Sequence, residues 1–211
     1  MDKFFAIGDI HGCFNKLFNL MDKIDIDHEK DTLVFLGDYI DRGPDSFEVI
    51  EYLIGLKKNF RKIIFLKGNH EEMLENYLKG PDKLTYLNNG GQNTLESYIK
   101  HNRHHGGSII PLKHLDFFKS LLFYYQTEKY IFVHAGLKKK VKLESQKSDD
   151  MLWIRKGFIN KNFDFGKRVV FGHTPFHEPF VDPYKIGIDT GAVYGNKLTC
   201  LVLPEISFYS S

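Results

Sequence analysis

The sequence predicts an α/β fold, and two observations along the chain support this class. In the first 80 residues, short apolar runs alternate with longer segments whose apolar residues recur at helical spacing. This order of strands and helices implies parallel strands joined by right-handed crossovers. From residue 123 onward the pattern becomes rich in strands, so the second half should add further strands to the structure.

The predicted elements follow one another in a regular order. The first half should contain strands at residues 4–7, 32–36 and 62–66, and helices at 13–24, 44–56 and 70–78. Residues 81–122 have a helical but irregular pattern, which glycine-containing segments interrupt. Further strands are expected at residues 123–126, 130–133, 168–171, 185–188 and 198–203. Residues 138–150 are polar and basic, so we expect a surface loop there.

Composition indicates an ordinary globular protein. The chain has 211 residues, of which 42% are hydrophobic and 27% are charged, and its formal net charge is +2. We predict one domain over residues 1–211, and this charge gives no reason to expect a nucleic-acid partner. Two cysteines, Cys13 and Cys200, form no recognisable framework, which favours a cytoplasmic protein. No apolar run approaches the ~20 residues of a membrane span, so no membrane partner is expected. The oligomeric state stays open.

Polar, metal-capable side chains follow five of the predicted strands. The five segments read GDIHG from residue 8, GDYIDRG from residue 37, GNHE from residue 68, HAG from residue 134 and GHTP from residue 172. Ligands of α/β sheets bind at the carboxyl ends of strands, so these loops should meet around one point. Their candidate metal ligands are Asp9, His11, Asp38, Asn69, His134 and His173.

These residue types suit a pair of transition-metal ions. Carboxylates and neutral imidazoles bind first-row metals, and a single carboxylate can bridge two of them. Two ions about 4 Å apart can activate a water and neutralise a phosphoryl group during its transfer. No serine or cysteine nucleophile is evident, so attack by a hydroxide bound to both metals is the simplest mechanism. Taken singly, each motif could be a capped turn or a buried histidine; five together in this order are hard to explain by chance.

The five segments, in this order, resemble the phosphoprotein phosphatase (PPP) family of calcineurin-like metallophosphoesterases, and in particular its bacterial, phage-lambda-type branch. The resemblance implies a two-sheet β-sandwich flanked by helices, with the active site at the carboxyl ends of the strands. It implies that Asp9 and His11 hold the first metal and that Asp38 bridges. Asn69, His134 and His173 would then hold the second metal. Manganese is the expected metal, with iron and zinc as alternatives.

The same resemblance implies roles for four further residues. His70 would protonate the leaving oxygen, and Asp41 would orient His70. Arg42 would grip the phosphate, and Arg155, in the Trp-Ile-Arg segment, matches a second phosphate-binding arginine. The chemistry agrees, because a carboxylate partner raises the pKa of a histidine and fixes its tautomer. A guanidinium group presents a planar fork that matches phosphate oxygens.

Three functions fit this site. The first is a serine/threonine protein phosphatase, with dual specificity as an extension, whose substrate is a phosphorylated protein or a small phosphoester. The second is a symmetrical bis(5'-nucleosyl)-tetraphosphatase, and the third is an inactive phosphate-binding protein. Asp41 favours the first, because the tetraphosphatase group often lacks this aspartate. The third ranks last, because neither a ligand nor the proton donor is missing.

Substrate selection is expected in the segment between residues 80 and 123, whose role the sequence does not define. His104 and His105 lie in this segment, in a glycine-flanked stretch that we interpret as a solvated loop.

Overall fold

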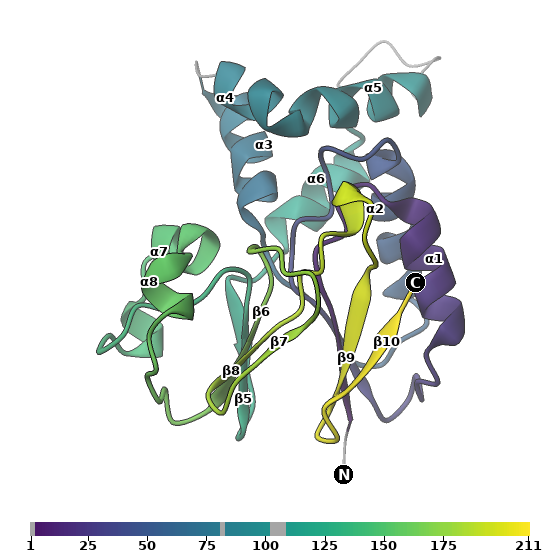
Figure 1. Cartoon of the computed structure of the whole chain (residues 1–211). Helices are drawn as coiled ribbons and strands as arrows, with labels where there is room; N and C mark the ends of the chain where they lie inside the picture. The colour runs from purple at the N-terminus through teal and green to yellow at the C-terminus, as the bar shows by residue number, and fades with distance from the viewer. Residues whose placement is uncertain (1–2, 81–82, 102–108) are drawn as a thin grey trace.

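A computed structural model describes residues 3–80, 83–101 and 109–211 of the chain. Within these ranges it contains two five-stranded sheets, and the expectation for His104 and His105 falls outside them. The first sheet has the strand order β10-β9-β1-β2-β3 and the second has the order β4-β5-β6-β8-β7. Helices cover the outer faces of both sheets (Figure 1). The predicted α/β sandwich is therefore confirmed.

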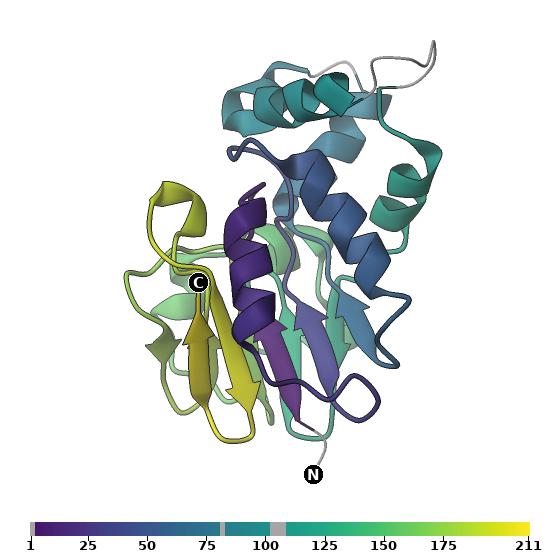
Figure 2. The same cartoon turned by 90° about the vertical axis from the view of Figure 1, so that its right-hand side faces the viewer.

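The first sheet is parallel on one side and antiparallel on the other. β1 (Phe4–Ile7), β2 (Thr32–Phe35) and β3 (Ile63–Phe65) run parallel, as the alternation of strands and helices predicts. β9 (Thr199–Leu203) pairs antiparallel with β1, and β10 (Ser207–Ser210) extends the sheet beyond β9. The connecting helices are α1 (Phe14–Lys23) and α2 (Ser46–Leu56), which lie side by side against this sheet (Figure 2).

The second sheet has a parallel centre and two antiparallel edges. β5 (Tyr130–Val133), β6 (Arg168–Phe171) and β8 (Lys185–Gly187) run parallel at its centre. β4 (Tyr124–Gln126) and β7 (Phe180–Val181) pair antiparallel at its two edges. Two short helices, α7 (Ser148–Trp153) and α8 (Lys156–Ile159), lie on the flank of this sheet. The predicted surface loop at 138–150 is thus partly wrong, because it contains a 3-10 turn at Leu143–Ser145 and the first turn of α7.

Alternation along the strands creates the core between the sheets. In β1, Phe5 and Ile7 face the helices, whereas Ala6 faces the other sheet. The layer between the sheets is fully apolar and buried; it includes Ala6, Val34, Leu36, Phe132, Val170, Ile186 and Leu201. This apolar interface fixes the two sheets face to face, so loops at their common end keep a defined separation.

The remaining helices stand above that end of the sheets. α3 (Asn69–Lys79) begins directly after β3 and leads to a short turn, α4 (Leu84–Tyr86). A π-type turn (Leu87–Gly91), kinked at Gly90 with φ 97°, joins α4 to α5 (Gln92–His101). α6 (Leu112–Lys119) packs against α2 and completes the region. None of the helices in the described ranges has the length and apolar character needed to cross a membrane.

Candidate active site

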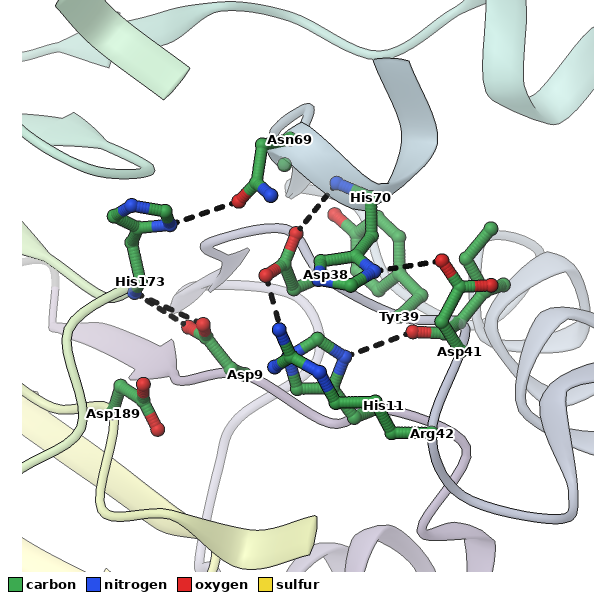
Figure 3. Close-up of polar contacts among 12 residues, drawn as sticks. Asp9, His11, Asp38, Tyr39, Asp41, Arg42, Asn69, His70, His173 and Asp189 are labelled. Atoms are coloured by element: carbon green, nitrogen blue, oxygen red, sulfur yellow. Dashed lines mark hydrogen bonds and ion pairs between the residues drawn. The ribbon is translucent and has the colours of Figure 1, made fainter. Parts of the chain in front are cut away.

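The six predicted metal ligands meet at the carboxyl ends of strands from both sheets. All six side chains are buried. They come from the loops after β1, β2, β5 and β6 and from the start of α3, and Figure 3 shows most of them around one centre. The structure thus brings together residues that are far apart in the sequence, as the positions of the motifs predict.

One group of ligand atoms surrounds His134. Its Nδ1 donates a hydrogen bond to the Leu36 carbonyl oxygen (2.9 Å), so in the neutral ring Nε2 carries a lone pair. That lone pair faces Asn69 Oδ1 at 3.0 Å and Asp38 Oδ1 at 3.4 Å. A cation between these three acceptors would satisfy all of them. Asp38, His134 and His173 place one ligand atom each within 4.8 Å of one another, which suits a metal ion.

A second group surrounds His11. Its Nδ1 donates to the Ile40 carbonyl oxygen (2.9 Å), and its Nε2 lies 3.3 Å from Asp38 Oδ2. His11, Asp38 and His70 also place one ligand atom each within 4.8 Å of one another. Asp38 belongs to both groups through its two oxygens, which is the arrangement that a bridging carboxylate requires.

The protonation states fit metal binding. Burial lowers the pKa of His11 to about 3 and that of His173 to about 3, so both rings are neutral near pH 7. Burial opposes ionisation of Asp38, but the neighbouring His134, His70 and His11 outweigh it and hold the Asp38 pKa below its usual range. Neutral imidazoles beside an ionised carboxylate are the form of these groups that metals bind.

Two further carboxylates add negative charge to the site. Asp9 accepts the backbone N–H of His173 (3.2 and 2.9 Å), and Asp189 lies beside it (Figure 3). Burial, then the charges of Asp189 and Asp38, raise the pKa of Asp9 well above its ordinary value. Burial also raises the pKa of Asp189 to about 6. Divalent cations would relieve this repulsion, so the donor set and its charge both fit metal ions.

His70 lies at the same centre but is held differently. Its Nδ1 donates to Asp41 Oδ2 (2.7 Å), and its buried Nε2 has no hydrogen-bond partner among the described residues. Burial alone would lower the pKa of His70, but the carboxylates of Asp38 and Asp41 raise it above the ordinary value. A histidine that keeps a proton and has one free nitrogen at the site is suited to proton transfer.

Two residues, one from α4 and one from α5, hold the Asp41 carboxylate by hydrogen bonds. The Tyr86 hydroxyl donates to Asp41 Oδ1 (2.7 Å), and so does the Thr94 hydroxyl (2.6 Å). The Asp41 backbone N–H in turn donates to Thr94 Oγ1 (2.9 Å). Residues 84–101 therefore fix the Asp41 carboxylate, and through it His70. Sequence reasoning assigned a role to neither residue, because neither stands in one of the five motifs.

Tyr86→Phe is expected to lower kcat about tenfold, because one of the three hydrogen bonds that hold the Asp41 carboxylate is lost. The measurement is steady-state hydrolysis of a phosphoester with metal present. Tyr98→Phe is a matched control, because Tyr98 donates a similar bond, 2.8 Å from His114 Nδ1, away from Asp41. Equal losses of kcat in the two variants would contradict a positioning role for Tyr86.

The two predicted phosphate-binding arginines lie at the rim of the cluster. Arg42 Nη1 donates to His11 Nε2 (2.6 Å), and Arg155 Nε donates to His173 Nε2 (3.0 Å). Arg42 is partly buried, whereas Arg155 is exposed. One guanidinium therefore adjoins each group of ligands, where it could pair with phosphate oxygens.

Backbone strain is concentrated at this site. Among the non-glycine residues with positive φ in the described ranges, most are predicted site residues: His11, Asp38, Asp41, Arg42 and His173, with φ from 47° to 72°. Each such residue costs roughly 1 kcal/mol or more, so the surrounding structure must enforce the conformation. Gly68 allows one of these loops to close, because a Cβ at this position would overlap Asp38 Oδ1.

Glu71 provides much of that enforcement. Its Oε2 accepts the backbone N–H groups of Asp38 (3.0 Å) and Gly68 (2.9 Å), and its Oε1 accepts that of Tyr39 (2.9 Å). Burial, then the charge of Asp38, raise the pKa of Glu71, whereas the three N–H donors stabilise its ionised form. The GNHE segment contains Glu71, but the sequence gives no sign that it ties two loops together.

Glu71→Gln is expected to lower the free energy of unfolding by about 2 kcal/mol. In either orientation the new amide NH2 group would face at least one of the three buried N–H donors. Chemical denaturation of the metal-free protein measures this change. Glu72→Gln is the matched control, since Gln keeps an acceptor for the Trp153 indole N–H (2.9 Å in the parent). Similar stability of both variants would contradict the bracing role of Glu71.

The fold and the cluster of acids and histidines define a hydrolase of phosphoesters that works with metal ions. The family model for calcineurin-like phosphoesterases matches residues 3–198, and the chain belongs to this family. Its His and Asp groups can bind metals at the centre described above.

Curated relatives extend this likeness over nearly the whole chain. A bis(5'-nucleosyl)-tetraphosphatase PrpE [asymmetrical] from Bacillus mycoides is 32% identical over 235 residues, covering 99% of this chain and 93% of the relative. The protein of the same name from Halalkalibacterium halodurans is 28% identical with the same coverage.

Solved structures support the same fold. A structure named as that of a candidate diadenosine tetraphosphatase is 25% identical, with a TM-score of 0.77, and covers 100% of this chain and 93% of that one. A protein serine/threonine phosphatase from Saccharomyces cerevisiae is 18% identical, with a TM-score of 0.60, over 95% of this chain and 72% of that one. The second likeness shows the fold alone.

Proposed function

We propose that this protein hydrolyses dinucleoside tetraphosphates, with diadenosine tetraphosphate as the reference substrate, and that it cleaves them asymmetrically. The observation that carries the proposal is the near-complete match to relatives named asymmetrical tetraphosphatases. These relatives favour the tetraphosphatase alternative over the protein phosphatase that the sequence motifs favour. They also favour asymmetrical rather than symmetrical cleavage, which revises that alternative.

The proposed roles assign the six buried ligands to two divalent cations. Asp9 and His11 would hold one cation, Asn69, His134 and His173 the other, and Asp38 both. Bound cations would supply an activated water and neutralise phosphate charge, with manganese the expected metal and iron and zinc the alternatives. The support from the structure is the convergence of neutral imidazoles and ionised carboxylate at one buried centre.

The other site residues act on the substrate. Arg42 and Arg155, one beside each group of ligands, would pair with phosphate oxygens and orient the chain of phosphates. His70 would donate a proton to the oxygen that leaves, and Asp41 would hold its Nδ1 so that Nε2 points into the site. Tyr86 and Thr94 would keep Asp41 in place.

Product analysis tests the direction of cleavage. Asymmetrical hydrolysis adds water across one phosphoanhydride bond and converts diadenosine tetraphosphate into equal amounts of ATP and AMP. Symmetrical hydrolysis breaks the central bond and gives ADP alone. With manganese-loaded protein we expect ATP and AMP, separated by anion-exchange chromatography at early times. Formation of ADP as the first product would contradict the asymmetrical assignment.

A phosphopeptide panel assayed with the same enzyme separates the two classes of substrate. We expect kcat/KM to favour the dinucleotide by about 10³, since a site that binds two nucleosides gains contacts that a peptide lacks. The contrary result, preference for phosphoserine or phosphothreonine peptides, would support the protein phosphatase instead. Hydrolysis of neither substrate, with metal bound, would support the inactive binding protein.

A further inference from the structure

An exposed aromatic side chain lies beside each of the two rim arginines. Trp153 is 41% exposed, and its ring makes a T-shaped contact with the His173 ring, with 6.2 Å between ring centroids. Tyr194 is 64% exposed and lies under the Arg42 guanidinium, 5.6 Å from the ring centroid. Large aromatic surfaces that remain exposed next to a polar site are candidates for stacking with a flat ligand.

Trp153 is held in position by its surroundings. It is the last residue of α7, whose Met151 and Leu152 side chains are buried. The carbonyl oxygen of Met151 accepts the backbone N–H of Ala135 (2.8 Å), which ties α7 to the loop after β5. The indole Nε1 donates to Glu72 Oε2 on α3 (2.9 Å). The ring is therefore fixed before any ligand arrives, which lowers the entropic cost of stacking.

We propose that Trp153 is the stacking surface for a nucleobase of the substrate, an inference that rests on the proposed function. Arg155, two residues further along the chain, reaches His173 and would bind the phosphate of the same nucleotide. Only the ribose separates the α-phosphate of a nucleotide from its base. A phosphate held at His173 and Arg155 therefore leaves its base within reach of the adjacent indole.

Tyr194 is the competing ring, and two observations place Trp153 ahead of it. The cationic guanidinium of Arg42 lies over one face of Tyr194, whereas the Trp153 ring makes a T-shaped contact with the His173 ring. The indole also offers the larger π surface of the two, and stacking on an aromatic side chain accepts any base. Tyr194 thus serves as the comparison residue in the test.

Intrinsic fluorescence tests the assignment directly, because Trp153 is the only tryptophan of the chain. The manganese-loaded protein is titrated with AMP, with ribose 5-phosphate and with inorganic phosphate. We expect AMP to quench the indole in a saturable manner, with the two ligands that lack a base producing little change. Equal responses to AMP and ribose 5-phosphate would overturn the proposal.

Variants provide a second, independent measurement. Trp153→Ala should weaken competitive inhibition by AMP about tenfold, with a much smaller effect on inhibition by ribose 5-phosphate. Trp153→Phe keeps an aromatic face and should restore most of the AMP affinity, which a purely structural role for the indole would not predict. If Tyr194→Ala removes the preference for AMP while Trp153→Ala keeps it, the assignment to Trp153 is overturned.

The outcomes separate this proposal from the proposed function. Asymmetrical cleavage of diadenosine tetraphosphate without base-dependent quenching would remove the Trp153 assignment and leave the function standing. Base-dependent quenching in a protein that does not cleave dinucleotides would support the stacking site and remove the proposed reaction.

Discussion

His70→Asn is expected to lower kcat by about 10² to 10³ for phosphoesters with poor leaving groups, while the bound metal stays unchanged. The reason is the different environment of the two ring nitrogens of His70. Nδ1 is anchored to Asp41 at 2.7 Å, whereas the buried Nε2 has no hydrogen-bond partner in the described ranges. An asparagine can keep a hydrogen bond to Asp41 but cannot donate an acidic proton.

The choice of ester makes this experiment decisive. Phenolate is a poorer leaving group than p-nitrophenolate, so phenyl phosphate depends more on a proton donor. The loss of kcat should therefore be much larger with phenyl phosphate than with p-nitrophenyl phosphate. Metal analysis of the purified variant provides the second readout. His70 also forms a possible triad with His11 and Asp38. Loss of metal together with equal losses for both esters would therefore make His70 a ligand rather than a proton donor.

Asp38→Asn is expected to lower kcat/KM by more than about 10² and to reduce the manganese content from two ions to one or none. Changes in residues that only support metal ligands cost 10- to 100-fold, and Asp38 is placed to bind both cations itself. The substitution is conservative for the backbone. Asparagine tolerates the positive φ of 52° and keeps an acceptor for the His70 backbone N–H, 3.1 Å away in the parent.

Thermal unfolding with and without manganese measures the same prediction in a second way. Manganese should raise the Tm of the parent protein, because it binds the folded state, and should raise that of Asp38→Asn much less. Asp45→Asn, an acid-to-amide change at the start of α2, is the matched control. If Asp38→Asn retains two ions and the full rise in Tm, the bridging role is wrong.

The sequence predicts the parallel strands of both sheets well, because each is a short apolar run and all except β8 precede a motif. It misses β7 and β10 for physical reasons. β7 has two residues, Phe180 and Val181, which is too short to show any alternation. β10 begins with exposed residues at the edge of its sheet, where burial leaves no pattern. The six-residue helix α7 is missed because less than two turns cannot show helical spacing.

The site residues divide in the same way. Some are recognisable from their residue type in a motif, whereas others matter only through the contacts that they make after folding. Residues whose chemistry is visible in a motif, such as Asp9 and His134, can be identified from the sequence. Glu71 and Tyr86 cannot, because their importance lies in which backbone N–H or carboxylate they reach after folding. Asp189 lies outside the five motifs, and its charge acts on Asp9 only because the chain after β8 lies against the chain after β1 in space.

The active site is formed by loops from both sheets, and this arrangement determines when during synthesis the enzyme can become active. The loops after β1 and β2 and the start of α3 leave the ribosome first, and they carry Asp9, Asp38 and Asn69. His134 and His173 follow only after another 65 and 104 residues beyond Asn69, respectively. A nascent chain therefore displays four of the six proposed metal ligands for several seconds at ordinary elongation rates. Phosphoester hydrolysis can begin only when the second half of the polypeptide has emerged and folded against the first.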